Sequence, residues 1–314
     1  MQHIPVAGRA TPSGNQVIHP IYLPYAAEQL ARHFVGDGSR HIEHFERSAQ
    51  RYDAFMAAHR DATDVALSVA RRPRQIEQDE RVWSVAALKH VFDHPQRDER
   101  LIDLLASCFG KRPPVRDLPT WGTCLEGPLE LFFQVQYPSP PAYLSWLAEH
   151  LEQRHLIPFV LDAARRPSRR PLEGPVTVDA VLLNPANGFA VLFEAEVLDD
   201  CLSDVPYDSL RNQLTRTIDV MVEPTRGLGP TLDRRRPHRT LFCMLTPQLF
   251  RDHPESRHYA ALLIDYMGCN DTLARDLLHR EARLLDGVSS RLGWLTFEDL
   301  LRGFPGACPW MTTA

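Results

Sequence analysis

The chain has 314 residues, of which 44 % are hydrophobic and 24 % are charged, and its formal net charge is −5 at pH 7. These values lie near globular averages, so they exclude wholesale disorder and fibrous architectures, and the acidic balance excludes a surface coated in basic residues. No stretch reaches the roughly 18 consecutive apolar residues of a membrane helix, and no basic segment followed by an apolar run opens the chain. We therefore expect a cytoplasmic protein without a membrane partner, in which any nucleic-acid contact comes from local patches.

Residues 1–115 predict a mainly α-helical N-terminal region. Apolar residues recur at helical spacing between residues 26 and 110, as with Val82, Val85 and Leu88. Paired prolines within residues 111–120 predict a boundary, because proline ends helices and stiffens linkers. This region carries no motif to which chemistry can be attached.

Residues 116–314 predict an α/β domain with a core at about 142–246. The expected elements are a helix at 142–154, strands at 157–161, 176–183 and 189–198, a helix at 206–221 and a strand at 239–246. A turn signal at 184–188 makes the second and third strands a hairpin. The order α, β, β, β, α, β predicts a layered fold with a mixed sheet.

Three carboxylates interrupt the two hairpin strands, Asp179 in one and Glu194 and Glu196 in the other. Because side chains alternate along a strand, Glu194 and Glu196 share a face, and the hairpin brings Asp179 back alongside them. An acidic cluster inside apolar strands is costly unless a cation neutralises it. Carboxylate oxygens suit Mg²⁺, with Mn²⁺ as a substitute, and such an ion can activate water and stabilise charge on a phosphodiester. The sequence therefore predicts a Mg²⁺ site.

This stretch resembles the PD-(D/E)XK nuclease superfamily, whose restriction-endonuclease-like core has the same αβββαβ order. The resemblance rests on Asp179, 14 intervening residues, the tripeptide Glu194-Ala195-Glu196 and the helix and strand that follow. It implies that Asp179, Glu194 and the carbonyl of Ala195 bind the metal. It also implies that Glu196 stands where a lysine usually orients or activates the attacking water. The implied function is Mg²⁺-dependent hydrolysis of DNA phosphodiester bonds, in a defence or repair context.

The sequence departs from the family at Glu196. Lys89 and Lys111 are the only lysines in the chain, so no lysine of the C-terminal half can take the missing role. Some restriction enzymes of this fold have glutamate at that position and remain active. A naturally inactive relative and an engineered charge reversal are the other two interpretations. A catalytically inactive protein that serves as a binding or scaffold subunit is therefore the alternative function.

The resemblance also implies residues around the metal. Many members place a polar residue on the helix after the hairpin, and Gln213 has that position, so we expect it to support the site. Some relatives have an additional glutamate, for which the sequence offers four positions: Glu126, Glu130, Glu149 and Glu152.

Two arginine clusters flank the predicted strands, and their members are Arg165, Arg166, Arg169 and Arg170, and Arg234, Arg235 and Arg236. Guanidinium groups pair well with phosphate through their fork of donors. We expect these loops to contact a DNA backbone without reading its sequence. By analogy with many such nucleases, the protein would act as a homodimer or in a larger complex.

Overall fold

A five-stranded mixed sheet lies at the centre of the computed structural model, which describes residues 17–59, 76, 79–166, 171–198, 200 and 205–311. Its strands, in their order across the sheet, are β3 (Glu130–Tyr137), β4 (Val176–Asn184), β5 (Phe189–Ala195), β6 (Thr240–Thr246) and β7 (Leu292–Thr296). The pairs β3–β4 and β4–β5 are antiparallel, whereas β5–β6 and β6–β7 are parallel. The predicted α/β class with a mixed sheet is therefore confirmed.

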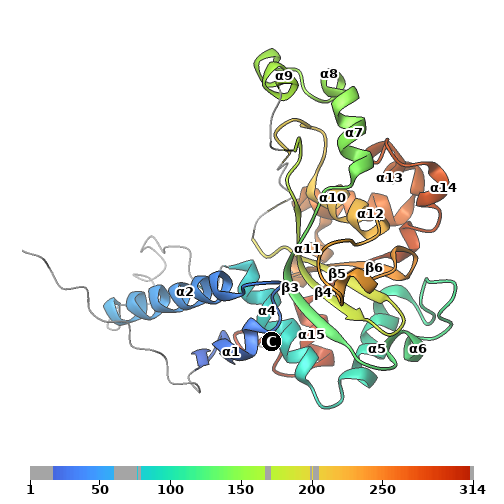
Figure 1. Cartoon of the computed structure of the whole chain (residues 1–314). Coiled ribbons are helices and arrows are strands. Elements are labelled where there is room, and N and C mark those ends of the chain that lie inside the picture. Colours follow the sequence, from blue (N-terminus) through green and yellow to red (C-terminus); the bar gives the residue numbers. More distant parts are fainter. Residues whose placement is uncertain are drawn as a thin grey trace, which may run out of the picture.

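Helices cover both faces of this sheet (Figure 1). One face of the sheet, called the α4 face, is covered by α4 (Glu80–Asp93), α5 (Arg97–Phe109) and α15 (Phe297–Gly303). The opposite face, called the α10 face, is covered by α10 (Gln213–Val222), α12 (His258–Gly268) and α13 (Asn270–Asp276). Every residue of β5 and β6 is buried, because strands covered on both sides have no solvated face.

The predicted hairpin joins β4 to β5, and two residues, Asn184 and Gly188, determine the conformation of its turn. The side chain of Asn184 donates to the carbonyl oxygens of Cys124 and Glu126, each at 2.9 Å. Gly188 has a φ of +78°, and a Cβ there would lie 2.7 Å from Cγ of Arg236. Only glycine combines this backbone conformation with so close a neighbour, which explains the residue at this turn.

The remaining elements surround this core. A two-stranded sheet pairs β1 (Val17–His19) with β2 (Leu23–Ala26). The other helices are α1 (Ala27–Ala31), α2 (Ser39–Ala58), α6 (Trp121–Leu125), α7 (Pro141–Glu149), α8 (Leu151–Arg154), α9 (Pro158–Arg165), α11 (Gln248–Asp252) and α14 (Ala282–Leu285). Figure 1 shows two projections from the sheet, one formed by α2 and the other by α7, α8 and α9. Within the described ranges, no helix has the length and apolarity needed to cross a membrane.

One predicted strand is wrong, and two other elements have shorter bounds than predicted. Residues 157–161 do not form a strand, because α9 begins at Pro158, where proline suits the first turn of a helix. The strand that precedes β4 is instead β3, at Glu130–Tyr137. The helix expected from residue 206 begins only at Gln213, and the strand expected to reach residue 198 ends at Ala195.

Residues on both sides of the predicted boundary at 115/116 belong to one hydrophobic cluster. Val85 and Leu88 of α4 are buried together with Phe193 of β5 and Leu245 of β6. The first helices therefore cover the sheet that the later residues form. The division into residues 1–115 and 116–314 stays a prediction.

Candidate active site

The predicted carboxylates lie where two neighbouring strands separate. The ladder between β4 and β5 runs from the hairpin to the pair Ala180 and Phe193, and ends there. Asp179 and Glu194 are the next residues on the two strands. The backbone N–H of Ala195 donates to Oδ2 of Asp179 at 2.8 Å, so a side-chain oxygen takes the place of a strand carbonyl. The hairpin thus brings both carboxylates to one gap in the sheet.

Gln134, on the other side of β4, holds the second oxygen of Asp179. Its Nε2 donates to Oδ1 of Asp179 at 2.7 Å. Gln134 has a φ of +52° and is the one non-glycine residue with positive φ in the described part of the chain. In β3, Phe133 packs on the α4 face but Val135 packs on the α10 face, and β4 makes the same change across Asp179. The side-chain alternation of both strands is therefore interrupted at this pair.

Substitutions at Gln134 should reveal the strain in its backbone. Gln134→Gly relieves the positive φ and loses the hydrogen bond to Asp179, whereas Gln134→Ala keeps the strain and loses the bond. We expect the alanine variant to be less stable than the glycine variant by about 1 kcal/mol in denaturant unfolding. Gln136, exposed in the same strand without positive φ, is the control, because alanine should there be the more stable variant. The same order at both positions would contradict the assignment of strain to Gln134.

Glu194, Glu196 and Gln213 come together on the α10 face. Glu194 is 1 % exposed, and Oε1 of its carboxylate accepts a hydrogen bond from Nε2 of Gln213. Gln213 is the first residue of α10, which the side chain of Asn212 caps. Glu196 is also buried, and its backbone N–H donates to the carbonyl oxygen of Leu245 at 3.0 Å. The predicted supporting role of Gln213 thus has a direct contact.

The surroundings of Asp179 and Glu194 disfavour the charged form of both carboxylates. Burial raises the pKa of Glu194 well above its usual range, and the charges of Asp179 and Glu196 add to this rise against the bond from Gln213. Burial also raises the pKa of Asp179, which outweighs the hydrogen bond from the backbone of Ala195. Without a counter-charge the site therefore tends to take up a proton, and a cation in the gap would replace that proton.

Glu80 is a further residue of the site that the sequence did not reveal. It is the first residue of α4, after the cap residue Asp79. Its Oε1 accepts hydrogen bonds from the backbone N–H groups of Val197 at 2.8 Å and Leu198 at 3.0 Å, directly after β5. The charge of Glu80 contributes to the raised pKa of Asp179. The available signal was an acidic residue at the start of a helix that precedes the first strand.

None of the four glutamates considered for an additional role takes this position. Glu126 and Glu130 lie at the hairpin end of the sheet, where Glu130 pairs with Leu183. Glu149 and Glu152 are exposed on α7 and α8, which project from the sheet (Figure 1). Of the glutamates named so far, Glu80 is instead the one whose charge, together with burial, raises the pKa of Asp179.

The arginine cluster before β6 lies away from the carboxylates. Arg235 is 3 % exposed, and its guanidinium donates to the carbonyl oxygens of Val220 and Met221 at 3.0 and 2.8 Å. Because Arg235 is buried, its predicted contact with nucleic acid is wrong, and its guanidinium instead stabilises the fold. Arg234 and Arg236 are exposed beside Gly188, six residues before Glu194 along β5. At the rise of a strand, that separation is about 20 Å.

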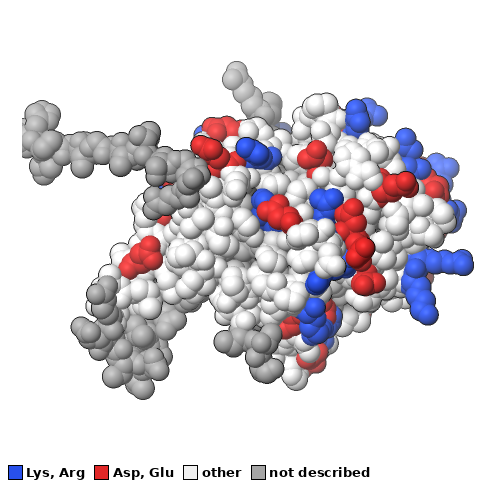
Figure 2. Space-filling model, turned by 90° about the horizontal axis from the view of Figure 1, so that it is seen from below, with Lys and Arg blue, Asp and Glu red and all other residues white. Residues whose placement is uncertain are grey.

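The other arginine cluster is described only in part. Arg165 and Arg166 are exposed at the end of α9, and Arg165 forms an ion pair with Glu152. Arg169 and Arg170 lie outside the described residues. On the face seen from below, Figure 2 shows acidic and basic side chains next to one another. Among the described arginines of the two clusters, Arg235 is buried, and Arg165 pairs with Glu152 at the end of α9.

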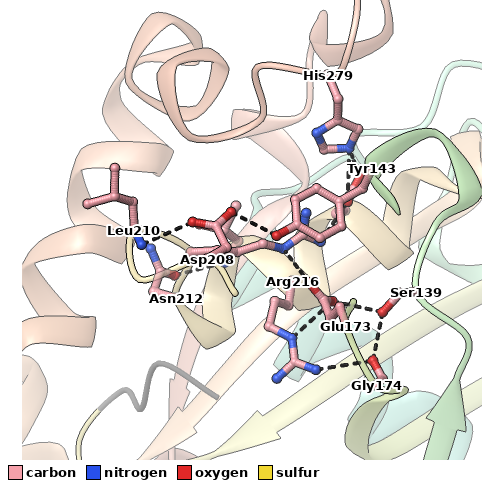
Figure 3. Close-up of polar contacts among 12 residues, drawn as sticks. Ser139, Tyr143, Glu173, Gly174, Asp208, Leu210, Asn212, Arg216 and His279 are labelled. Atoms are coloured by element: carbon pink, nitrogen blue, oxygen red, sulfur yellow. Dashed lines mark hydrogen bonds and ion pairs between the residues drawn. The ribbon is translucent and has the colours of Figure 1, made fainter. Parts of the chain in front are cut away.

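A buried ionic network holds α10 behind Gln213 (Figure 3). Arg211 donates to Asp219 at 2.7 Å and lies 3.3 Å from Glu173, and its guanidinium is 3.4 Å from the ring centre of Tyr143. The other members are Arg154, Asp208, Arg216, His279 and Arg280. Because Arg211 precedes Gln213 by two residues and Asp219 lies within α10, the network fixes the helix that presents Gln213 to Glu194.

The donor set fits a divalent cation held by few side chains. Among the described residues, no group of three or more His, Cys, Asp and Glu side chains is arranged to hold a metal. Mg²⁺, however, is commonly bound through one or two carboxylates plus water. Oε2 of Glu194 is buried and has no hydrogen-bond partner among the described residues, which leaves an acceptor for such an ion.

Comparisons with protein-family models, curated proteins and solved structures gave no match.

Proposed function

We propose that the protein is a Mg²⁺-dependent nuclease that hydrolyses DNA phosphodiester bonds at the gap between β4 and β5. The observation that carries the proposal is the pair Asp179 and Glu194, brought together at one gap with raised pKa values. One of the four carboxylate oxygens, Oε2 of Glu194, is buried and accepts no hydrogen bond from the part of the chain that the structure describes. Two like charges in such a place favour a bound cation.

The order of the elements supports a restriction-endonuclease-like core. Helices α4, α5 and α6 precede three antiparallel strands, β3, β4 and β5, which are followed by α10 and by β6 parallel to β5. This is the αβββαβ order, with β3 in place of the strand expected at 157–161. Residues 138–175 then form an insertion between the first two strands.

The proposed chemistry assigns a role to each residue of the gap. Asp179, Glu194 and the carbonyl of Ala195 would hold Mg²⁺, which when bound offsets their charge and stabilises negative charge on the phosphate. In hydrolysis a water oxygen bonds to phosphorus while the P–O bond to one sugar oxygen breaks. The carboxylate of Glu196 would accept the proton of that water, and the leaving oxygen takes a proton from solvent. Gln213 keeps Glu194 oriented.

A cleavage assay and a metal titration test this proposal together. Supercoiled plasmid incubated with the protein and Mg²⁺ should become nicked or linear, and Asp179→Ala should abolish the reaction. Calorimetric titration with Mn²⁺ should detect binding that the same substitution removes. Glu130→Gln, in β3 opposite Leu183 at the hairpin end of β4, is the control and should behave as wild type. A wild-type protein that binds no metal and leaves the plasmid intact contradicts the proposal.

Glu196 is the observation that favours the second candidate function, a nuclease-fold protein that binds without cutting. It adds a third negative charge near Glu194, where a lysine would supply a positive one. If the wild type binds Mn²⁺ but does not cut, and Glu196→Lys cuts, the natural protein is an inactive relative. If the wild type cuts and Glu196→Lys does not, the glutamate belongs to the active site.

A further inference from the structure

We propose that one face of α2 holds the phosphate backbone of the nucleic acid and leads it to the carboxylate gap. This inference rests on the proposed function and names the substrate-binding surface of the same site. The surface, called the α2 face below, consists of His44, Arg47, Gln50, Arg51 and Ala54.

The α2 face is an open depression lined by two arginines. Its volume is about 420 Å³, and the described residues that line it include no acidic side chain. The lining residues follow the helical spacing i, i+3, i+6, i+7 and i+10, so they form one stripe about 15 Å long. Two arginines four residues apart on such a stripe suit an extended chain of phosphates, because each guanidinium can bind phosphate through two donors.

The inner end of this stripe is linked to the start of α4, which carries Glu80. His44 is hydrogen-bonded to Asp79, the residue before Glu80, and Arg81 lies 3.3 Å from the same aspartate. Glu80 and Arg81 both influence the pKa of Asp179, in opposite directions. Figure 1 shows α2 projecting away from the sheet beside α4. A chain lying on the α2 face therefore passes from the projection towards the gap.

The arginines of the α2 face are available for exchange with phosphate. Arg47 pairs with Glu43 at 3.3 Å, and their side chains are 61 % and 54 % exposed. Exposed pairs of this kind contribute at most about 1 kcal/mol. Arg51 is exposed, and its hydrogen bonds to other described residues are long, 3.3 Å to the carbonyl of Arg47 and 3.5 Å to Ser48. By contrast, the contacts of Arg235 occupy its guanidinium inside the fold.

The test measures binding without cleavage. Fluorescence anisotropy of labelled duplex and single-stranded DNA, in the presence of EDTA, gives the dissociation constant at several salt concentrations. The double variant Arg47→Ala, Arg51→Ala should bind at least about tenfold more weakly than wild type, and the slope of log K against log salt should fall by about 1.5 to 2. Its melting temperature should not change, because alanine favours an exposed helix. Arg112→Ala, Arg116→Ala, which removes two exposed arginines between α5 and α6, is the control and should bind as wild type.

The outcomes separate this inference from the proposed function. If the wild type cuts DNA and the α2 variant binds and cuts equally well, the α2 face is not the binding surface and the nuclease proposal stands. If the wild type binds without cutting and the α2 variant loses binding, the surface stands and hydrolysis does not. If the wild type neither binds nor cuts DNA, both fail.

Discussion

Glu194→Gln should give a protein that is more stable than wild type and inactive as a nuclease. In the folded protein, burial and the charges of Asp179 and Glu196 raise the pKa of Glu194. An ionised Glu194 therefore costs stability at neutral pH, and a neutral amide of the same shape removes that cost while its oxygen can still accept the bond from Gln213. We expect a gain of about 1–2 kcal/mol, the size of a typical effect of one substitution. Cleavage should fall by at least about 10³-fold, because a charge that stabilises the reaction is lost.

The pH dependence of the same variant has a definite sign. A carboxyl group whose folded pKa is raised binds more protons in the folded state, so stability falls as pH increases from the ordinary glutamate value through the raised one. Wild type should show this loss in thermal unfolding above about pH 4.5, the ordinary glutamate value. Glu194→Gln should show only the part of this loss of stability that comes from the raised pKa of Asp179. Mn²⁺ should raise the melting temperature of wild type but not that of the variant.

The control for this experiment is Glu130→Gln, an exposed position at the far end of the paired strands. It should keep the pH profile, the metal response and the cleavage of wild type. A Glu194→Gln protein that unfolds more easily than wild type at pH 8 would show that Glu194 has a compensating partner. A variant that still cuts DNA would remove Glu194 from the proposed mechanism.

The hairpin and its carboxylates could be predicted because their signals are local. Residues 176–184 and 189–195 are apolar runs rich in β-branched and aromatic side chains, separated by a turn with Asn184 and Gly188. The alternation of a strand then places Glu194 and Glu196 on one face, and the period of a helix brings Gln213 towards them. Each of these inferences needs only neighbours within one or two elements.

The exchange of β3 and α9 shows where local signals are ambiguous. Residues 157–161 are a short apolar run, which fits a strand as well as a helix. Pro158 is compatible with the start of either element. In the structure Leu161 of α9 packs only partly against the small cluster around Tyr143, and α9 has no buried residue. Residues 130–137 form the strand because they pack within the sheet, whereas residues 157–161 lack such packing.

Gln134 could not be found from the sequence, and Glu80 had only the weak signal of an acidic residue at a helix start, because Asp179 is distant from both along the chain. Glu80 precedes Asp179 by 99 residues and Gln134 precedes it by 45. The positive φ of Gln134 also has no sequence signal, because glutamine rarely adopts it. The predicted nucleic-acid contact of Arg235 is wrong for a related reason. Composition cannot distinguish an exposed arginine from one whose donors are used inside the fold.

Asp219→Ala should destabilise the protein by about 3–5 kcal/mol, the cost of leaving buried cations without a counter-charge. Asp219 accepts hydrogen bonds from Arg211 and Arg280, each at 2.7 Å, and from His279 at 3.0 Å. Burial alone would raise its pKa, but the bond from His279 and the two arginine charges outweigh burial and lower the pKa to about 2. Because Arg211 is 1 % exposed, water cannot take the place of the lost carboxylate.

Acid should reveal the same interaction in the wild type. A carboxyl group with a lowered folded pKa contributes stability that is complete above its ordinary value of 3.8 and is lost as the pH falls towards 2. For Asp219 this contribution amounts to about 2 kcal/mol. Urea unfolding between pH 5 and 2.5 should show the loss in wild type, and Asp219→Asn should lack that part of the slope.

The matched control is Asp98→Ala, which removes a carboxylate from an ion pair of 2.7 Å with Arg97 on the surface of α5. Both changes delete one aspartate from an arginine partner, and they differ in burial, since Asp98 is 56 % exposed and Asp219 is 0 % exposed. The exposed pair should cost less than about 1 kcal/mol, because water and salt screen it. Equal costs at the two positions would mean that the network does not hold α10. Gln213 should then stay in place in the Asp219→Ala protein, and its Mn²⁺ affinity should match that of wild type.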